Sequence, residues 1–164
     1  MNQPEILIVG AGGMGALFGS ILHENGLKVV LYDTNTEHIS AIQQMGLKIE
    51  GYGGDRTIPI AATSKLSELA SAEIIIFQCK SHGTRQAAKA VRPLITQESV
   101  CISFQNGLGN EEVMAEELGN DFVMGGLTAM AGVLLEPGKI RDFSRVPSHI
   151  GEMRGGISER ARTI

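Results

Sequence analysis

Residues 5–33 read EILIVGAGGMGALFGSILHENGLKVVLYD, and this stretch decides the fold. Its opening, EILIVG, is short, apolar and β-branched, which is typical of a strand buried on both faces of a parallel sheet. The following AGGMGALFGSILHENG has apolar residues at helical spacing, and Gly26 supplies the left-handed residue that ends many helices. KVVLYD repeats the strand pattern. The stretch therefore predicts a strand, a helix and a second strand in direct succession.

The turn between the first strand and the helix has the spacing G-x-G-x-x-G. Gly10 would permit the tight turn, Gly12 would let a pyrophosphate approach the backbone, and Gly15 would let the helix pack close to the sheet. A diphosphate would meet the free N–H groups and the positive end of the helix dipole. We therefore expect a nicotinamide dinucleotide to bind over this glycine loop, which comprises Gly10, Ala11, Gly12, Gly13, Met14 and Gly15.

Asp33 ends the second strand, 18 positions after Gly15. Folds of this kind place a carboxylate there to accept hydrogen bonds from the adenosine ribose. A 2′-phosphate near an ionised Asp33 would be repelled by roughly 1 kcal/mol in water and up to ~4 kcal/mol at a protein surface. The position therefore favours NAD over NADP. The alternatives are that Asp33 only caps the next helix, or that Thr34 and Asn35 tolerate a phosphate.

The strand and helix alternation continues along the chain. TEHISAIQQMG, SKLSELAS, RQAAKAVRPL and NEEVMAEELG have helical patterns, the last capped by Asn110, whereas EIIIFQC and SVCISF are typical of buried strands. LKIEG and TIPIAA predict a third strand and a small excursion. FVMGGLTAMAG, KIRDF and SHIGE are strand-like and are joined by a Pro137-Gly138 turn. SERARTI predicts a helix that begins at Ser158.

These patterns predict an α/β fold of the Rossmann type, with a doubly wound, mostly parallel sheet. We expect one dinucleotide-binding domain over residues 1–164. Nothing in the sequence ends the last helix or covers it with a further apolar face. Our interpretation is that the chain is a fragment whose remaining domain is absent.

The composition limits the class of protein. Hydrophobic residues make up 43% and charged residues 20% of the 164 positions, as in ordinary globular domains. The net charge of −4 and the scattered Lys and Arg argue against a nucleic-acid partner. No segment approaches the ~18 apolar residues of a membrane span, and no signal peptide precedes the first strand, so we expect a cytoplasmic protein without a membrane partner.

The cysteines and histidines suggest no metal site. Cys79 and Cys101 lie in apolar runs and are expected to be small buried hydrophobes rather than a disulfide. The four histidines lack metal-ligand spacing. We expect His23 and His38 on exposed helix faces. His82 follows a strand end and could contact the nicotinamide end of the cofactor, but a loop histidine without a role is the more ordinary interpretation.

The later motifs suggest a family. GAGGMG, then CKSH at 79–82, QNGLGNEE at 105–112 and VMGGLTAMAG at 123–132 together resemble the ketopantoate reductases, the 2-dehydropantoate 2-reductases of pantothenate biosynthesis. The resemblance covers essentially the whole chain, including the excursion between Gly46 and Thr63. It implies an oxidoreductase that reduces 2-dehydropantoate, a small 2-oxo acid, to pantoate with NAD(P)H.

The resemblance also implies site residues. Lys80 and Asn106 correspond to a lysine and an asparagine that face the nicotinamide ribose and the substrate, and Ala131 corresponds to a position that flanks the cofactor. Both polar residues follow strands, at the edge where open α/β sheets bind ligands. From the residues alone, Lys80 could equally be a solvated charge, and Asn106-Gly107 only a turn.

The resemblance places the general-acid lysine and most substrate contacts in a helical C-terminal domain outside these 164 residues, and it leaves room for a homodimer. The chain departs from the family at the second strand. The family usually prefers NADPH and has a basic residue there, where this chain has Asp33-Thr34-Asn35. The resemblance therefore implies NADP(H) while Asp33 favours NAD(H). Two other functions stay open: a dinucleotide-sensing regulatory module, and a hydroxyacid dehydrogenase with another substrate.

Overall fold

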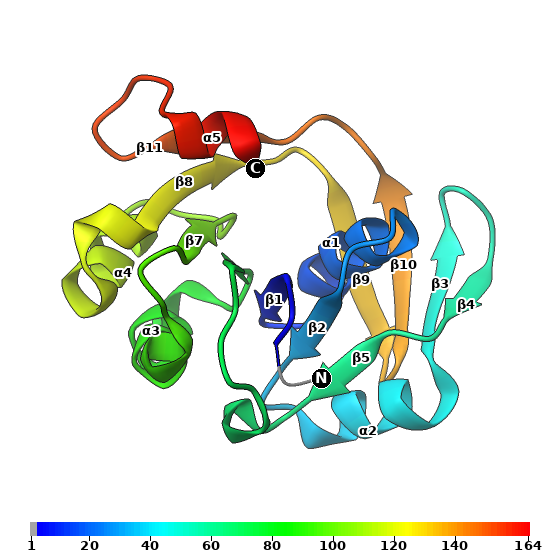
Figure 1. Cartoon of the computed structure of the whole chain (residues 1–164). Coiled ribbons are helices and arrows are strands. Elements are labelled where there is room, and N and C mark those ends of the chain that lie inside the picture. Colours follow the sequence, from blue (N-terminus) through cyan, green and yellow to red (C-terminus); the bar gives the residue numbers. More distant parts are fainter. Residues whose placement is uncertain (1–2) are drawn as a thin grey trace.

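The structure is a computed structural model that describes residues 3–164, and a seven-stranded sheet forms its centre (Figure 1). The strands lie in the order β5-β2-β1-β6-β7-β8-β11. The six strands from β5 to β8 are parallel, and β11 is antiparallel to β8. This order is that of the doubly wound dinucleotide-binding folds, so the predicted fold class is confirmed. The bounds are β1 Ile6–Val9, β2 Val29–Tyr32, β5 Ala61–Thr63, β6 Ile74–Phe77, β7 Val100–Ser103, β8 Val123–Leu127 and β11 His149–Glu152.

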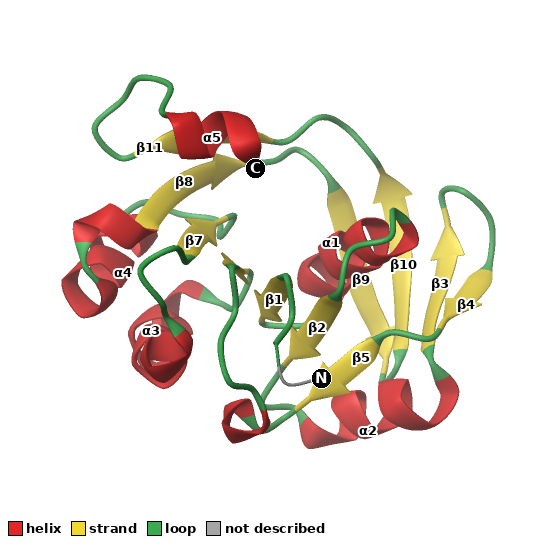
Figure 2. Ribbon diagram, in the orientation of Figure 1, coloured by secondary structure: helices red, strands yellow, loops and turns green. Residues whose placement is uncertain are grey.

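Helices cover both faces of this sheet (Figure 2). Residues alternate along the central strand β1, so that Ile8 faces a core shared with α1 and α2, whereas Val9 faces a core shared with α3 and α4. Burial on both faces explains why the strands read as unbroken apolar runs. The helices are α1 Gly13–Glu24, α2 Thr36–Met45, α3 Thr84–Val91, α4 Asn110–Leu118 and α5 Glu159–Thr163, with short 3-10 turns at Leu66–Glu68 (η1), Ser81–Gly83 (η2), Arg92–Leu94 (η3) and Asn120–Phe122 (η4).

A second sheet of four strands lies beyond α1 and was not predicted. Its order is β4-β3-β10-β9, with bounds β3 Leu47–Gly51, β4 Arg56–Ile58, β9 Ala131–Glu136 and β10 Lys139–Ser144. β3 and β10 pair in parallel although they lie far apart in the sequence. Buried side chains of the two strands, Ile49 and Ile140, join the core under α1 and α2. The predicted small excursion is therefore half of a separate sheet.

Three predicted elements need correction. TIPIAA is not one strand, because β4 and β5 on either side of Pro59 belong to different sheets. FVMGGLTAMAG likewise divides into β8 and β9. SKLSELAS forms only the 3-10 turn η1 rather than a helix.

Asn110 does not cap α4, as the sequence predicted. Gly109 precedes the helix with φ 88°, in a left-handed conformation, and Asn110 is the first helical residue. Glu111 and Glu112 do lie in the first turn, near the positive end of the helix dipole. The Asn110 side chain is buried and turns toward the preceding loop instead.

The sequence also led us to expect free cysteines and no membrane span. Cys79 and Cys101 are both free, and burial raises the pKa of the Cys101 thiol to about 12. Cys101 is therefore a neutral, apolar group of β7, as predicted. Across residues 3–164, no helix has the length and apolar character that crossing a membrane requires.

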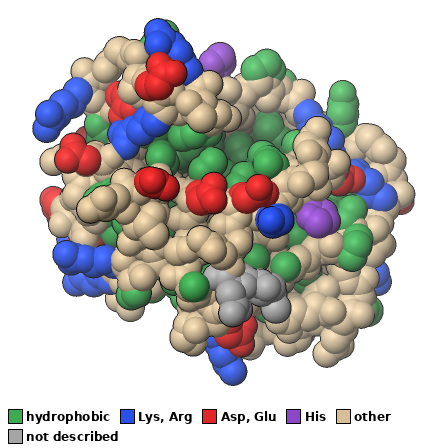
Figure 3. Space-filling view, in the orientation of Figure 1, with side chains coloured by type: hydrophobic (Ala, Val, Ile, Leu, Met, Phe, Trp, Pro, Cys, Tyr) green, Lys and Arg blue, Asp and Glu red, His purple; other side chains and the backbone are tan. Residues whose placement is uncertain are grey.

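Hydrophobic side chains reach the surface between α1 and α5, where Figure 3 shows them lining a hollow. Ile21, Ile150 and Ala161 are partly buried and pack against the core that the sheet shares with α1 and α2. The helix α5 begins where predicted, because the Ser158 hydroxyl accepts a hydrogen bond from the Ala161 N–H at 3.1 Å.

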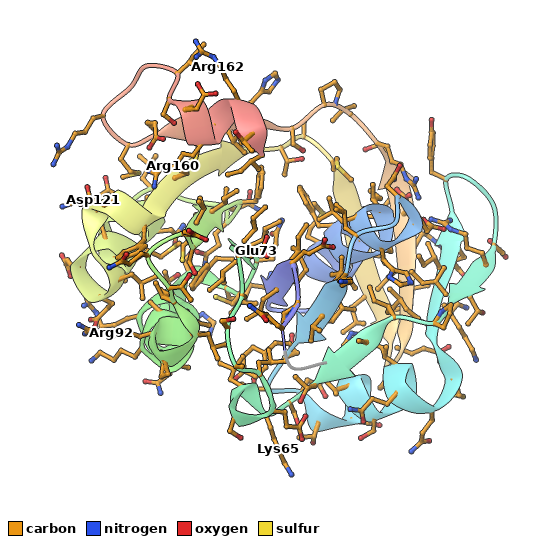
Figure 4. All side chains as sticks on the ribbon, in the orientation of Figure 1. Lys65, Glu73, Arg92, Asp121, Arg160 and Arg162 are labelled. Atoms are coloured by element: carbon orange, nitrogen blue, oxygen red, sulfur yellow. The ribbon has the colours of Figure 1, made fainter. Side chains whose placement is uncertain are left out.

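An ion pair fixes α5 to β11. Arg160 donates from Nε and Nη2 to the two Glu152 carboxylate oxygens at 2.8 and 2.5 Å. Its Nη1 donates to the carbonyl of Asp121, and Figure 4 labels Arg160 and Asp121. Hydrogen bonds from Arg160 and then Ser158 lower the pKa of Glu152 to about 2. The stabilisation is therefore present above the ordinary carboxyl pKa and is lost as the pH falls towards 2.

Replacing Arg160 with glutamine should lower the melting temperature by a few degrees at pH 7, because Glu152 loses its bidentate partner. The difference from the parent should shrink between pH 4.5 and 2 as Glu152 is protonated. Calorimetry between pH 7 and pH 2 measures the difference in melting temperature between the variant and the parent. Arg154→Gln removes an exposed arginine from the turn between β11 and α5 and is the control. A difference for Arg160→Gln that stays constant with pH would contradict the assignment.

Candidate functional site

A groove follows the carboxyl ends of the central parallel strands. It consists of two adjoining cavities of about 550 and 430 Å³, which share Gly12, Gln78, Cys79 and Lys80. We name the larger cavity the Asp33 half and the smaller one the Asn106 half, after a residue that lines each. Both volumes lie in the range typical of ligand sites, and this edge is where open α/β sheets bind ligands.

The glycine loop forms the floor of the groove. Gly10 has φ +96°, and a Cβ atom there would lie 2.5 Å from the Cys79 nitrogen, so only glycine fits. Gly15 packs against the Gly10 carbonyl, which agrees with the predicted close approach of α1 to the sheet. At Gly12 a Cβ atom would meet nothing within 4 Å and Gly12 lines both halves, so the backbone is open to a ligand.

Within residues 3–164, the amino terminus of α1 has no side-chain cap. The Gly12 N-cap provides no side-chain hydrogen bond, and the first turn contains no acidic residue. The first backbone hydrogen bond of the helix runs from the Ala16 N–H to the Gly12 carbonyl at 2.8 Å, which leaves the earlier N–H groups without a helical acceptor. Free N–H groups and a positive dipole end fit a diphosphate.

Gly13 has a role that the motif did not predict. A Cβ atom at Gly13 would lie 2.5 Å from the Val133 Cα, because the start of α1 lies directly against the backbone of β9. Gly132 in the same strand contacts the Gly13 carbonyl and Leu17 in a similar way. The second sheet therefore forms one wall of the Asn106 half, where Gly132 and Val133 both line the cavity.

Asp33 lies half-buried in the Asp33 half. Its Oδ1 accepts a hydrogen bond from the Asn35 N–H at 2.9 Å. The cap of α2 is Asn35, whose Oδ1 accepts from the His38 N–H at 3.1 Å. Asp33 is therefore not the helix cap, which removes one alternative interpretation. Its second carboxylate oxygen makes no hydrogen bond within the described residues and suits a sugar hydroxyl.

Lys80 and Asn106 both line the Asn106 half of the groove. Lys80 follows β6 and precedes η2, and Asn106 follows β7; both side chains are exposed. The neighbouring Ser81 hydroxyl donates to the Asn106 carbonyl at 2.8 Å and ties the two loops together. An ammonium and an amide that line one cavity can donate to ribose hydroxyls or to a substrate oxygen.

A buried polar network holds these two loops in place. The Gln105 amide donates to the Cys79 carbonyl at 2.8 Å and to the Thr84 hydroxyl at 2.7 Å. The Thr84 hydroxyl in turn donates to Asn110 Oδ1 at 3.1 Å, and Asn110 Nδ2 donates to the Asn106 carbonyl at 3.1 Å. Sequence reasoning missed this network, although the position of Gln105 directly before Asn106 was a signal.

Gln78 and Cys79 lie where the two halves join. The Gln78 Nε2 is buried and has no hydrogen-bond acceptor among residues 3–164. Its position at the carboxyl end of β6, two residues before Lys80, was the signal that could have identified it. Burial raises the pKa of the Cys79 thiol to about 11, so Cys79 is a neutral thiol rather than a nucleophile at pH 7.

Ala131 and His82 do not line the Asn106 half. Ala131 begins β9 and is exposed, next to Met130 and Gly132, which line the Asn106 half; Ala131 itself lines neither half. His82 lies in η2 and lines the Asp33 half rather than the Asn106 half.

His38 is buried and not exposed, contrary to the prediction. Its side chain lies behind the glycine loop, where Nε2 is 2.8 Å from the Ala11 carbonyl oxygen and Nδ1 accepts from the Gly138 N–H at 2.9 Å. The prediction failed because the partner that covers this face of α2 comes from a turn 100 residues away.

As for metals, residues 3–164 contain no group of three or more His, Cys, Asp or Glu side chains placed to hold an ion.

Known proteins resemble this chain along most of its length. Residues 6–155 match the family described as "Ketopantoate reductase PanE/ApbA". A 2-dehydropantoate 2-reductase of Pyrococcus abyssi is 36% identical over 137 residues, which cover 84% of this chain and 44% of that protein. The chain thus spans about half the length of the curated relatives it matches.

Two solved structures carry the same comparison into three dimensions. The 2-dehydropantoate 2-reductase of Geobacter metallireducens is 28% identical with a TM-score of 0.86, over 94% of this chain and 51% of that one. A D-mandelate dehydrogenase solved with NADH and anilino(oxo)acetate is 25% identical with a TM-score of 0.78, over 89% of this chain and 47% of that one.

Gly12 and Gly13 differ in the space available for a side chain, and this difference predicts different effects of alanine substitution on stability. Gly13→Ala should destabilise the fold by about 1–3 kcal/mol, because the new methyl group overlaps the β9 backbone. Gly12→Ala should change the free energy of unfolding by less than about 0.5 kcal/mol, because its methyl group enters open space. Urea unfolding of both variants gives the comparison. Equal stabilities would show that β9 does not lie against the loop.

Proposed function

The chain belongs to the ketopantoate reductase family, and from that premise we propose that it binds a nicotinamide dinucleotide in the groove for the reduction of a 2-oxo acid. The observation that carries the proposal is the uncapped amino terminus of α1, which opens into the groove between Asp33 and Asn106. The relatives named 2-dehydropantoate 2-reductase make 2-dehydropantoate the first substrate to test.

We assign the cofactor by the chemistry of each half of the groove. The N–H groups of Gly12, Gly13 and Met14 would hold the diphosphate. The Asp33 carboxylate would accept hydrogen bonds from the adenosine ribose. The nicotinamide would then extend into the Asn106 half, between the two loops and the β9 wall. The geometry supports this order because Gly12 lies between the two halves.

The groove residues suit a 2-oxo acid. The reduced nicotinamide, when bound, supplies a hydride to the oxo carbon. The Lys80 ammonium would donate to a ribose hydroxyl or a substrate oxygen, and the Asn106 amide would orient the same end. The hydrogen bonds of Ser81 and Asn110 to the Asn106 carbonyl would hold that residue still during the reaction. A sensing module would need neither side chain there.

Asp33 selects between the two dinucleotides in this proposal. NADPH carries a phosphate on the ribose hydroxyl that Asp33 would otherwise bind. The carboxylate can repel that phosphate. Positions 33–35 are Asp, Thr and Asn, so none of them carries a positive charge that would attract the phosphate. We therefore propose NAD(H) as the cofactor, although the family resemblance implies NADP(H).

The parent chain should bind NADH at least about fivefold more tightly than NADPH, as a repulsion of about 1 kcal/mol requires. Asp33→Asn keeps the side-chain size and removes the charge, so it should strengthen NADPH binding and narrow the ratio. Fluorescence titration of both cofactors measures this. Glu37→Gln, an exposed acid in the first turn of α2, is the matched control. Tighter binding of NADPH by the parent would contradict the proposal.

We further propose that residues 1–164 form the cofactor-binding half of the reaction, with the general-acid lysine and most substrate contacts in a separate helical domain. The groove then provides the dinucleotide site and only Lys80 and Asn106 toward the substrate. A cytoplasmic location and a homodimer of the full-length protein stay predictions.

The 164-residue chain is therefore expected to bind NADH and to leave 2-dehydropantoate unreduced, because the proton donor for the oxo oxygen lies outside it. Absorbance of NADH at saturating 2-dehydropantoate follows the reaction. Steady turnover by the chain alone would mean that its own residues complete the site and would refute this division of labour.

A further inference from the structure

His38 lies behind the glycine loop, on the side away from the groove. The residue is 1% exposed and belongs to the first turn of α2. Its Nδ1 accepts the hydrogen bond from the Gly138 N–H, so in the neutral ring the proton is on Nε2. That Nε2–H then donates to the Ala11 carbonyl at 2.8 Å. One neutral tautomer satisfies both partners.

The contact with Ala11 sets the direction of the next N–H group. The Ala11 carbonyl and the Gly12 N–H belong to one planar peptide, and in a trans peptide these two groups point in opposite directions. Because His38 holds the carbonyl on its own side, the Gly12 N–H points away from His38. The other side of Ala11 is also fixed, since its N–H donates to the Tyr32 carbonyl at 3.1 Å.

The contact with Gly138 joins the loop to the second sheet. Gly138 lies in the turn between β9 and β10, and β9 is the wall against which Gly13 packs. His38 therefore contacts both the back of the loop and the end of the hairpin that borders its front. α2, the glycine loop and the hairpin are coupled through this one side chain.

We infer that His38 is a positioning residue for the dinucleotide, which turns the Gly12 N–H toward the groove. This inference rests on the proposed function, because it assigns the diphosphate to that N–H. His38 lines neither half of the groove and acts through the Ala11 peptide. Loss of its Nε2 donor should free that peptide to rotate, whereas loss of its Nδ1 acceptor should affect the hairpin.

Two amide substitutions separate the contacts. In His38→Gln the side-chain amide reaches the position of Nε2 and can still donate to Ala11, but it leaves the Gly138 N–H without an acceptor. In His38→Asn the amide oxygen lies near the position of Nδ1 and can accept from Gly138, but it leaves the Ala11 carbonyl without a donor. Each variant loses one buried hydrogen bond, so their melting temperatures should fall by similar amounts.

NADH affinity should distinguish the two. His38→Asn and His38→Ala should raise the Kd for NADH about tenfold, whereas His38→Gln should stay within about threefold of the parent. Titration calorimetry of the folded variants measures this. His23→Gln, in the last turn of α1 and far from the loop, is the control. If His38→Gln and His38→Asn lost NADH affinity equally, or if His38→Ala kept the Kd of the parent, the role of His38 would be structural only.

A ligand-free measurement keeps this inference separate from the proposed function. The ¹⁵N–¹H resonance of Gly12 should move in His38→Asn and His38→Ala and stay close to its parent position in His38→Gln. An unchanged Gly12 resonance in all three variants would overturn the inference whether or not the chain binds NADH. A parent chain that binds neither NADH nor NADPH would instead overturn the proposed function.

Discussion

The site depends on the amino-terminal end of α1, which the described residues 3–164 leave without a capping partner. The first N–H groups of α1 have no helical acceptor, no capping side chain and no nearby carboxylate in the first turn. Such groups are costly to leave unpaired unless water or a ligand accepts from them. The sheet directs this helix end to the carboxyl edge of its central strands, so the unpaired donors, Asp33 and Asn106 all border one groove. An anionic ligand with a sugar on one side fits that arrangement.

The two sheets together hold the glycine loop in place. The parallel sheet contacts the loop through the Tyr32 carbonyl of β2, which accepts hydrogen bonds from the N–H groups of Gly10 and Ala11. The second sheet closes it from the side, where the β9 backbone leaves no room for a side chain at Gly13. A buried amide and hydroxyl network does the same for the loops after β6 and β7. The loops that carry Lys80 and Asn106 are thus held by hydrogen bonds of neighbouring residues.

Most of the parallel sheet could be predicted because β1, β2, β6 and β7 are short apolar runs, each followed by a helical pattern in the sequence. The second sheet could not. β3 and β10 are joined by Ile49 pairing with Ile140, and no local periodicity reports a partner 91 residues away. The burial of His38 was missed for the same reason. The glycine loop and Asp33 could be predicted as site candidates from short motifs, and Lys80 and Asn106 from the family resemblance. Gln105 and Thr84 could not, because the hydrogen bond that joins them links two loops.

The most direct measurement is a crystal structure of this chain with NADH. The account predicts diphosphate oxygens within hydrogen-bond distance of the N–H groups of Gly12, Gly13 and Met14, with the adenosine ribose on the Asp33 carboxylate. A dinucleotide bound elsewhere on the molecule, or lying in the groove with its diphosphate away from the start of α1, would contradict it.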